Sequence, residues 1–423
     1  MSKLVVTGGH RLIGRIRVGG RKNSAVAILP ATLLADGPSI VESVPDIQDV
    51  SVYCEILRHL GAKVTHFPVR DSEAPRVMID PRGLAQGTPP EGLAGKLRAS
   101  YYLLGVLLAR YGQAEVPFPG GCDFVTRPID QHVKGFTALG ATVKVEDGIV
   151  KARAPGRLVG AHVYLDVVSV GATINIMLAA TLADGVTVIE NAAKEPHVVD
   201  LANYLNAAGA QVKGAGTDII RITGVTRLEG ATHALIPDEI EAATYMIAAA
   251  ATDGDITVEN VIPKHLESVS AKLAETGAEV EDNGDYIRVK GNGRPRPVAI
   301  KTLPYPGFPT DAQEQVTAML TVASGTSLVT ETIWESRFKH VDELKRMGAQ
   351  ITVDGRMAVV EGVTRLTGAS VKATDLRAGA ALTIAGLMAE GETEILDIEH
   401  IERGYERPVE KLSSVGAKLR KIP

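Results

Sequence analysis

A glycine-rich segment places a thiol near a cation, in Pro119-Gly-Gly-Cys122 followed by Arg127. The glycine pair favours a loop, and a nearby cation lowers the pKa of a thiol, so Cys122 has the surroundings of a proton donor or a nucleophile. A single unpaired cysteine is also commonly an inert, space-filling side chain. The other cysteine, Cys54, falls inside an apolar helical pattern, which predicts that it is simply buried.

A second candidate for chemistry is the carboxylate Asp311, in the segment Phe308-Pro-Thr-Asp311. A carboxylate can accept a proton from a reacting hydroxyl group. The same segment also has a structural interpretation, because Thr310 and Gln313 have the spacing of a helix capping box and an acid stabilises the first turn of a helix. Both interpretations remain open on the local sequence.

Helix-capping residues recur at six places along the chain, and cations lie near several of them. The expected helix starts are Asn23/Ser24, Ser100, Ser169, Asp238, Thr310/Asp311 and Asp375. If these helices run parallel, their positive N-termini attract anions, and Arg21, Lys22, Arg98 and Arg377 add to that charge. The pattern predicts a ligand with several negative charges. The alternative is that these cations are ordinary surface residues.

The elements that position these residues come from a sequence repeat. A Gly-Ala phrase that ends a helical pattern recurs at positions 61, 140, 209, 277, 348 and 416, at intervals of 68–79 residues. A second set of glycines, at 37, 112, 185, 254, 325 and 391, follows an apolar helical pattern and predicts left-handed helix ends. Residues 225–231 and 363–369 are nearly identical and predict a further strand. We interpret the chain as six βαβαββ units.

Six units exceed one ordinary core, so the sequence predicts an α/β protein with two lobes of three units each. The break is expected near residues 231–237. Residues 4–18 predict strand structure that pairs with either the first or the last unit. In the second case the chain crosses between the lobes twice, which predicts a cleft between two similar lobes, a favoured place for a ligand.

Composition excludes several other classes of protein. The chain has 423 residues, of which 45% are hydrophobic and 4% aromatic, and its net charge of −5 argues against a nucleic-acid surface. Its apolar runs are too short to span a bilayer, and its N-terminus lacks a signal-peptide core. The two cysteines suggest neither a disulfide scaffold nor a metal site. These features predict a cytoplasmic protein without a metal or cofactor and carry no signal for its oligomeric state.

Short segments spread in order over the whole chain resemble the UDP-N-acetylglucosamine 1-carboxyvinyltransferase family. They are Lys22-Asn23, 97–100, 119–122, 127–130, 169–173, 308–311, 335–338, 374–377 and 403–407. The resemblance implies the two-domain inside-out α/β barrel of the enolpyruvyl transferases, with six repeats and an active-site cleft between the lobes. It also implies that residues 22–232 form one lobe, which carries the Cys122 loop, and that 1–21 with 233–423 form the other.

The activity implied by the resemblance is transfer of the enolpyruvyl group of phosphoenolpyruvate (PEP) to the 3-hydroxyl group of UDP-N-acetylglucosamine, with release of phosphate. This is the first committed step of peptidoglycan synthesis, so the resemblance also implies roles in cell wall biogenesis, cell shape, the cell cycle and cell division. It further implies a thiol that fosfomycin alkylates. Both substrates carry phosphate, which agrees with the anionic ligand expected above.

The resemblance assigns roles to individual residues. Cys122 is the implied general acid and Asp311 the implied base. The implied PEP-binding residues are Lys22, Asn23, Arg127 and Arg403. The implied nucleotide-binding residues are Arg98, Arg127, Pro128, Ile129, Asp130, Gln131, Val168, Ser169, Val170, Gly171, Asp311 and Ile333. Arg337, Asp375 and Arg377 are implied to line the cleft.

Two positions depart from the family pattern, Val125, where a glycine is usual, and Val167, where some members have a lysine. Two other functions compete with the implied one. The first is 3-phosphoshikimate 1-carboxyvinyltransferase, whose signature phrases are missing. The second is a non-catalytic paralogue that binds UDP-N-acetylglucosamine, and the joint presence of Cys122, Asp311 and Lys22 argues against it.

Overall fold

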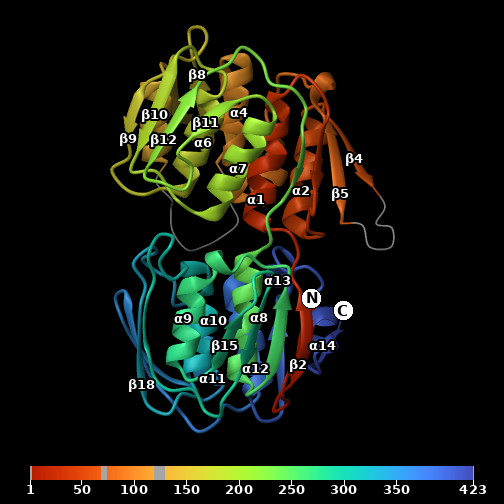
Figure 1. Cartoon of the computed structure of the whole chain (residues 1–423), viewed down its shortest axis with the longest axis vertical. Coiled ribbons are helices and arrows are strands. Elements are labelled where there is room, and N and C mark those ends of the chain that lie inside the picture. Colours follow the sequence, from red (N-terminus) through yellow and green to blue (C-terminus); the bar gives the residue numbers. More distant parts are fainter. Residues whose placement is uncertain (1, 68–73, 119–128, 423) are drawn as a thin grey trace. The chain divides into compact units, whose positions relative to one another are not determined.

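A computed structural model of the chain describes residues 2–67, 74–118 and 129–422. The chain divides into two compact units, one formed by residues 1–19 with 237–423 and the other by residues 20–236. The backbone therefore passes from one unit to the other at two places, after Gly19 and after Ile236. Figure 1 shows both units in the colours of the sequence.

The unit of residues 20–236 alternates helices and short strands. Its longer helices are α1 (Lys22–Ala31), α2 (Gln48–His59), α4 (Tyr102–Tyr111), α5 (Asp130–Ala138), α6 (Val170–Ala180) and α7 (Pro196–Ala207), and its short helical turns include α3 (Glu91–Ala94) and η3 (Arg98–Tyr101). Its strands are β3 (Ser39–Glu42), β4 (Lys63–Phe67), β5 (Arg76–Asp80), β6 (Gln113–Pro117), β7 (Thr142–Glu146), β8 (Ile149–Arg153), β9 (His162–Tyr164), β10 (Val186–Glu190), β11 (Gln211–Lys213), β12 (Ile219–Thr223) and β13 (Thr232–Ala234).

The other unit has the same alternation. Its helices are α8 (Glu239–Ala251), α9 (Glu267–Glu275), η5 (Thr310–Ala312), α10 (Gln313–Leu320), α11 (His340–Arg346), α12 (Leu376–Met388), α13 (Glu399–Glu402) and α14 (Pro408–Ser414). Its strands are β1 (Lys3–Thr7), β2 (Ile13–Arg17), β14 (Asp255–Glu259), β15 (Glu279–Asp282), β16 (Tyr286–Lys290), β17 (Ala299–Lys301), β18 (Thr326–Thr330), β19 (Gln350–Asp354), β20 (Met357–Glu361), β21 (Ser370–Lys372), β22 (Glu392–Leu396) and β23 (Lys418–Ile422).

The described strands form six small sheets. The five four-stranded sheets share one pattern, whereas the sheet β6-β8-β7 has three strands that all pair antiparallel. In sheets β9-β10-β12-β11 and β17-β18-β20-β19, the first two strands are parallel and the rest pair antiparallel. Buried and exposed side chains alternate along most strands, so each sheet buries one face. In two of these sheets the parallel strand comes from a distant part of the chain: β2 pairs with β14, and β13 pairs with β3. Each of these two strands lies next to one of the two crossings of the chain.

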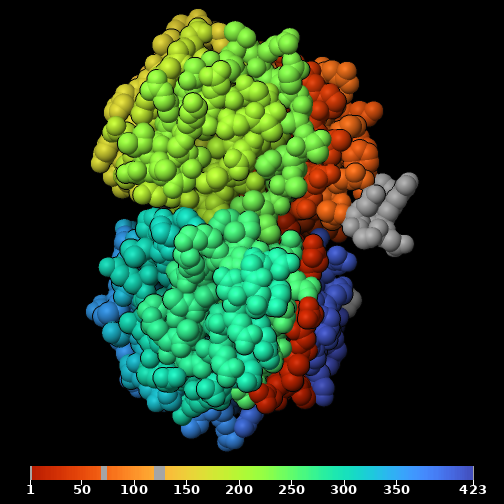
Figure 2. Space-filling view, viewed as in Figure 1, coloured from red at the N-terminus to blue at the C-terminus, as the bar shows by residue number. Residues whose placement is uncertain are grey.

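The N-terminal strand β1 lies in the last sheet of its unit, in the order β21-β22-β1-β23. Val5 pairs with Glu394 on one side and Arg420 on the other, both antiparallel. In Figure 2 the red N-terminal residues accordingly run beside blue C-terminal residues on the surface of this unit. The first and last segments of the chain therefore share one sheet.

Helices α8 and α12 are buried along almost their whole length. Both are rich in alanine, whose small side chain allows helices to pack closely. Figure 1 shows α8 and α10 in the interior of their unit, with β18 and β2 at opposite sides of it. In the other unit α4 meets α6 at Gly105, where an added Cβ atom would lie 2.5 Å from the carbonyl oxygen of Asn175. Only glycine fits there.

The glycine prediction is correct for one set and partly wrong for the other. All six glycines of the Gly-Ala phrase have φ between 92° and 102°, the left-handed conformation that ends a helix. In the second set only Gly112, Gly185 and Gly391 are left-handed, and those at 37, 254 and 325 are not. At Gly254 the reason is close packing, because an added Cβ atom would lie 2.3 Å from the carbonyl oxygen of Leu12, and the left-handed residue is Asp253 instead.

The strand predicted at residues 225–231 and 363–369 is displaced. The chain is irregular over both segments, and the strands β13 and β21 follow them at Thr232–Ala234 and Ser370–Lys372. The repeated phrase instead leads into the strand: Leu228 and Thr367 each make one isolated parallel bridge, to Ala35 and Glu390. The two similar phrases therefore mark the irregular segment that precedes a strand, not the strand itself.

Candidate active site

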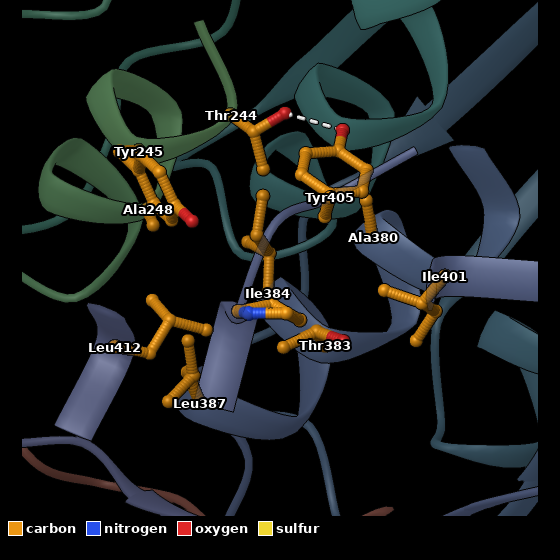
Figure 3. A pocket seen from close by; sticks show the side chains of 11 residues that line it. Thr244, Tyr245, Ala248, Ala380, Thr383, Ile384, Leu387, Ile401, Tyr405 and Leu412 are labelled. Atoms are coloured by element: carbon orange, nitrogen blue, oxygen red, sulfur yellow. Dashed lines mark hydrogen bonds between the residues drawn. The ribbon is translucent and has the colours of Figure 1, made fainter. Parts of the chain in front are cut away.

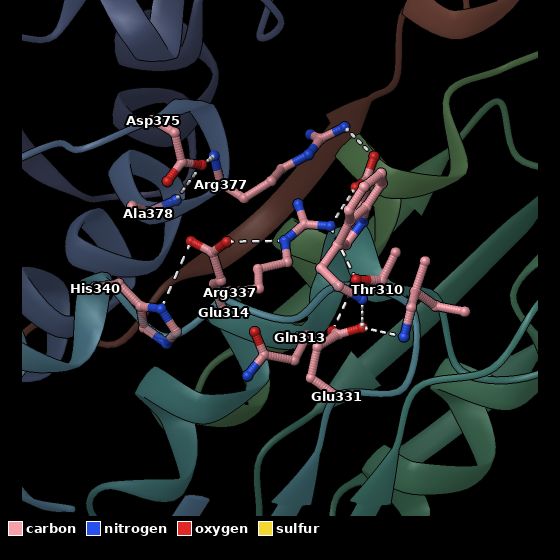
Figure 4. A network of polar contacts seen from close by, with 12 residues as sticks. Thr310, Gln313, Glu314, Glu331, Arg337, His340, Asp375, Arg377 and Ala378 are labelled. Atoms are coloured by element: carbon pink, nitrogen blue, oxygen red, sulfur yellow. Dashed lines mark hydrogen bonds and ion pairs between the residues drawn. The ribbon is translucent and has the colours of Figure 1, made fainter. Parts of the chain in front are cut away.

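Asp311 lies between two arginines in the unit formed by residues 1–19 and 237–423. Arg337 Nη1 donates to Asp311 Oδ1 at 2.9 Å, and Arg377 Nη2 donates to Asp311 Oδ2 at 3.1 Å. About 30% of the Asp311 side chain stays exposed, whereas each arginine is 8% exposed. Figure 4 shows the network around Arg337 and Arg377. The sequence-predicted residues Asp311, Arg337 and Arg377 are therefore brought together.

The two cations control the charge of Asp311. Burial alone would raise its pKa, but the charges of Arg377 and Arg337 outweigh burial and hold the pKa of Asp311 well below its ordinary value. The carboxylate is consequently ionised and oriented at neutral pH. An oriented, partly exposed carboxylate can accept a proton, and its basicity increases when either arginine is drawn towards another anion.

The capping-box interpretation of Thr310 and Gln313 is wrong. The residue before the helical turn is Pro309, which has no side-chain cap, and Gln313 Nε2 donates to Thr317 instead. Thr310 Oγ1 donates to Glu331 Oε2 at 2.8 Å and accepts from Arg337 Nη1 at 2.9 Å. Glu331 is fully buried, so its carboxylate requires donors, and Thr310 supplies one.

The far side of Arg337 contacts a second carboxyl group that the sequence did not predict. Arg337 Nε donates to Glu314 Oε1 at 3.0 Å, and Glu314 Oε2 lies 3.8 Å from His340 Nδ1. Burial, with a smaller contribution from Asp375, raises the pKa of Glu314 to about 8 despite the attraction of Arg337. Burial, followed by the charge of Arg337, lowers the pKa of His340 to about 3.

Arg377 is fixed at both ends. Asp375 caps helix α12 by accepting from the backbone N–H groups of Arg377 at 2.8 Å and Ala378 at 3.2 Å, as its residue type predicted. The guanidinium group of Arg377 donates to the hydroxyl group of Tyr405 at 3.2 Å and lies 5.6 Å from the centre of that ring. Asp375 therefore acts on Arg377 through the backbone.

The ring of Tyr405 borders a small apolar pocket within the same unit. Figure 3 shows the pocket lined by side chains such as Ile384, Leu387 and Leu412. The Tyr405 hydroxyl group points away to Thr244 Oγ1, at 2.8 Å, and also accepts from Gln315 Nε2 at 3.2 Å. Tyr405 thus presents its apolar ring to the core and its hydroxyl group to the arginine network.

Two further sequence-predicted residues lie in this unit. Ile333 is half-buried, and its backbone N–H donates to Glu331 Oε1 at 2.7 Å, the carboxylate that also binds Thr310. Arg403 directly follows α13, two residues before Tyr405, and is half-buried. Ile333 is therefore joined to the Asp311 network by hydrogen bonds, and Arg403 is near it along the chain.

In the unit of residues 20–236, the predicted cations Lys22 and Arg98 lie at helix starts. Lys22 begins α1 and forms an ion pair with Asp49 of α2, with Nζ and Oδ2 2.7 Å apart. The Lys22 and Asp49 side chains are 14% and 5% exposed. Asn23 is half-buried, and Arg98 begins the short helical turn before α4. The predicted helix start at Asn23/Ser24 is therefore one residue late, and no side chain caps it.

One predicted nucleotide-binding segment is hydrogen-bonded to Asp166, two residues before the other predicted segment begins. Gln131, near the start of α5, accepts from the backbone N–H of Asp166 at 2.9 Å and donates to its carboxylate at 3.2 Å. Ser169 caps α6 by accepting from Ala172 N at 3.3 Å, as predicted. Figure 1 shows α6 within this unit.

Other residues of these segments differ in exposure. Asp130 and Val168 are exposed, whereas Ile129, Val170 and Gly171 are half-buried. An added Cβ atom at Gly171 would lie 3.1 Å from His132 Nε2, so the glycine brings the start of α6 close to α5. These contacts place the segments around 130 and 168–171 side by side, with exposed groups for a ligand.

Cys122, Arg127 and Pro128, together with Val125, lie outside the described residues. The other cysteine, Cys54, is fully buried in α2, as the sequence predicted, and burial raises the pKa of its thiol to about 11. Cys54 is therefore protonated and inert at neutral pH.

Sequence reasoning missed Glu314, Tyr405, Asp49 and His340. Tyr405 lay inside the quoted segment 403–407, and Glu314 follows Asp311 by three residues, one helical turn away. Such spacing was available as a signal. Asp49 and His340 offered no local signal, because each meets its partner only through the fold.

The described residues contain neither a group of metal ligands nor a helix that could cross a membrane. In residues 2–67, 74–118 and 129–422, no three histidine, cysteine or acidic side chains are grouped as metal ligands would be. No helix in that part of the chain has the length and apolar character needed to cross a bilayer.

The chain is similar to several known proteins. Residues 6–412 match the family model of EPSP synthase (3-phosphoshikimate 1-carboxyvinyltransferase). The chain is 56% identical to UDP-N-acetylglucosamine 1-carboxyvinyltransferase 3 of Caldanaerobacter subterraneus subsp. tengcongensis, over 100% of both chains. It is 58% identical to the protein of the same name from Symbiobacterium thermophilum, over 99% of this chain and 97% of that one.

The fold is also similar to solved structures. The enolpyruvyl transferase NikO from Streptomyces tendae superposes with a TM-score of 0.88 at 28% identity, over 100% of this chain and 99% of that one. EPSP synthase from Acinetobacter baumannii shares the fold, with a TM-score of 0.74 at 20% identity over the full length of both. With its mixed α/β fold, full-length family match and close relatives, the chain belongs to the EPSP synthase family, which includes its UDP-N-acetylglucosamine 1-carboxyvinyltransferase relatives.

Proposed function

We propose that this protein transfers the enolpyruvyl group of PEP to the 3-hydroxyl group of UDP-N-acetylglucosamine and releases phosphate. The observation that carries this proposal is the identity of 56–58% to relatives named for that reaction, over essentially the whole chain. The arrangement of Asp311, Arg337 and Arg377 supports it, because the reaction needs an oriented base among fixed positive charges.

The proposed reaction is an addition followed by an elimination. Asp311 accepts the proton of the sugar hydroxyl group, whose oxygen attacks C2 of PEP while Cys122 delivers a proton to C3. The resulting tetrahedral ketal then loses a proton from C3 and phosphate from C2, which restores the double bond. Cations must bind the phosphate and carboxylate throughout, and we assign this role to Lys22, Arg127 and Arg403 together with Asn23.

The nucleotide is assigned to the segments around Gln131 and Ser169, which approach each other where Gly171 packs against His132. Asp130 and Val168 expose groups there, and Arg98 supplies a further cation. The same proposal includes the six βαβαββ repeats as an inside-out barrel, which the six small sheets and the buried helices support. It also includes a place in peptidoglycan synthesis within the cytoplasm and alkylation of Cys122 by fosfomycin.

The test is phosphate release by the purified protein. Release is expected only when PEP and UDP-N-acetylglucosamine are both present, and the product should carry an enolpyruvyl ether on the sugar by mass spectrometry. Release with PEP and shikimate 3-phosphate would favour the sister activity. If neither acceptor supports release while UDP-N-acetylglucosamine still binds, the chain would be a non-catalytic binding protein.

The variants Cys122→Ala and Asp311→Asn should lose most of the activity. The matched control for the thiol is Cys54→Ala, since Cys54 is buried away from solvent. Thr317→Val is the control for Asp311, because Thr317 lies in the adjoining helix α10 and its hydroxyl group bonds only within that helix in the contacts seen here. Equal losses in the variants and the controls would refute the assigned roles.

A further inference from the structure

The guanidinium group of Arg337 is shared between two carboxyl groups. Its Nη1 donates to Asp311 and Thr310, while its Nε donates to Glu314 Oε1 at 3.0 Å. The Glu314 side chain is 1% exposed, compared with 30% for Asp311. Figure 4 shows Glu314 on the side of Arg337 that faces His340. Glu314 therefore contacts Arg337 from within the core.

The bond to Nε determines how Arg337 is oriented. A guanidinium group is planar and has donors in fixed directions, so an acceptor at Nε fixes the plane in which Nη1 points. Here that direction leads to Asp311 Oδ1, 2.9 Å away. Without an acceptor, the buried Nε–H group would lose its partner and the guanidinium group would be free to rotate away from Asp311.

The surroundings of Glu314 disfavour ionisation of its carboxyl group. Its Oε2 has no hydrogen-bond partner among the described residues, and neither ring nitrogen of the fully buried His340 has one. Asp311 and Asp375 add negative charge near it, and Arg337 is the cation that binds it directly. Consistent with this environment, the pKa of Glu314 is raised to about 8.

We propose that Glu314 is a positioning residue whose carboxyl group orients Arg337 towards Asp311, so that the charge state of Glu314 sets how strongly Arg337 binds Asp311. The proposal rests on the proposed function for its catalytic consequence. A neutral Glu314 still accepts from Nε through Oε1 and leaves most of the Arg337 charge to Asp311. An ionised Glu314 competes for that charge, which loosens Asp311 and makes it a stronger base.

The first test compares two substitutions of similar size. Glu314→Gln keeps an acceptor for Nε but cannot ionise, whereas Glu314→Met removes the acceptor. In the wild-type protein kcat should rise between pH 7 and 9 as Glu314 ionises. Glu314→Gln should retain kcat near its wild-type value at pH 7 and lose this rise. Glu314→Met should reduce kcat about 100-fold through misplacement of Arg337, with a smaller change in KM.

The outcome that overturns the proposal is specific. A Glu314→Met variant with wild-type kcat, or a Glu314→Gln variant that keeps the rise above pH 7, would show that Glu314 does not act through Arg337. Thr317→Val, in the same helix, serves as the control and should leave both kcat and the pH profile unchanged.

The second test needs no enzyme activity. A double-mutant cycle compares free energies of unfolding in urea for four proteins. They are the wild-type protein, Asp311→Asn, Glu314→Gln and the double variant. Because both carboxyl groups bind Arg337, the two substitutions should be non-additive at pH 9, where Glu314 is ionised, and closer to additive at pH 6. Additivity at both pH values would refute the proposal. Coupling in a protein that transfers no enolpyruvyl group would instead refute only the proposed function.

Discussion

Arg377 and Asp311, 66 residues apart in the chain, form an ion pair in which Nη2 and Oδ2 are 3.1 Å apart. The same arginine lies in the first turn of helix α12, where its backbone N–H donates to Asp375. A cation fixed at both its backbone and its guanidinium group moves little, so Asp311 is held in one orientation. The relationship makes Arg377 a determinant of both the position and the basicity of Asp311.

We predict that Arg377→Lys reduces kcat/KM about 100-fold, because an ammonium group cannot reach Asp311 and Tyr405 in the forked geometry of arginine. The charge is retained, so the loss would come from geometry. Steady-state kinetics measure the effect. As a control, Arg365→Lys changes an exposed arginine that pairs only with Glu390 in the contacts seen here and should leave kcat/KM unchanged. A nearly active Arg377→Lys variant would contradict the orienting role.

Tyr405→Phe tests the hydroxyl group separately from the ring. The ring should still line the apolar pocket, but Arg377, Thr244 and Gln315 would lose a common hydrogen-bond partner. We expect the free energy of unfolding to fall by about 1–3 kcal/mol. Urea unfolding measures it. Tyr405→Leu should cost more because it also removes ring atoms. A Tyr405→Phe variant as stable as the wild-type protein would show that the hydroxyl group contributes little.

Much of the fold was predictable because it is encoded locally. The helix caps at Ser169, Asp238 and Asp375 depend on a side chain and the next few backbone N–H groups, and all three predictions are confirmed. The Gly-Ala phrase was equally reliable, because a left-handed helix end strongly favours glycine. The errors arose where tertiary contacts determine the backbone conformation. At Gly254 the close neighbour is Leu12, which lies far away in the sequence.

The candidate site was predictable only at the residues that the family resemblance names. Asp311, Arg337 and Arg377 were named from a family resemblance, and the fold joins them. Glu314 was missed although it follows Asp311 by one helical turn, whereas His340 was missed because it meets its partners only through the fold. The Thr310–Gln313 spacing was misleading for the same reason, because the distant Glu331 takes the hydroxyl group of Thr310.

The two cysteines should differ sharply in reactivity. Burial raises the pKa of Cys54 to about 11, so an epoxide or iodoacetamide should not modify it in the folded protein. We predict a single adduct, on Cys122, identified by peptide mass spectrometry. Cys54→Ala should be labelled at the wild-type rate, and both thiols should react in urea. An adduct on Cys54 in the folded protein would contradict the assignment of Cys122 as the reactive thiol.

Asp49→Asn should weaken the unit that contains Lys22. The ion pair is largely buried, so neutralising Asp49 removes a carboxylate charge beside the Lys22 ammonium group and should reduce the free energy of unfolding by about 3 kcal/mol. The KM for PEP should also rise if Lys22 binds that substrate. Asp36→Asn is the matched control. Asp36 is well exposed, and its ion pair with Arg110 is long, with Oδ1 and Nη1 3.8 Å apart. Equal stability of the two variants would mean that the Lys22–Asp49 pair contributes little.

His340 predicts a dependence of stability on acid. Its ordinary pKa of 6.5 is lowered to about 3 in the folded protein, first by burial and then by Arg337. Between these values the unfolded chain binds a proton that the folded protein does not, so the free energy of unfolding should fall as the pH falls from about 6.5 towards 3. His340→Gln cannot bind this proton, so its stability should fall less steeply over that range. Urea unfolding of both proteins at several pH values measures the difference, and parallel curves would show that His340 does not titrate on unfolding.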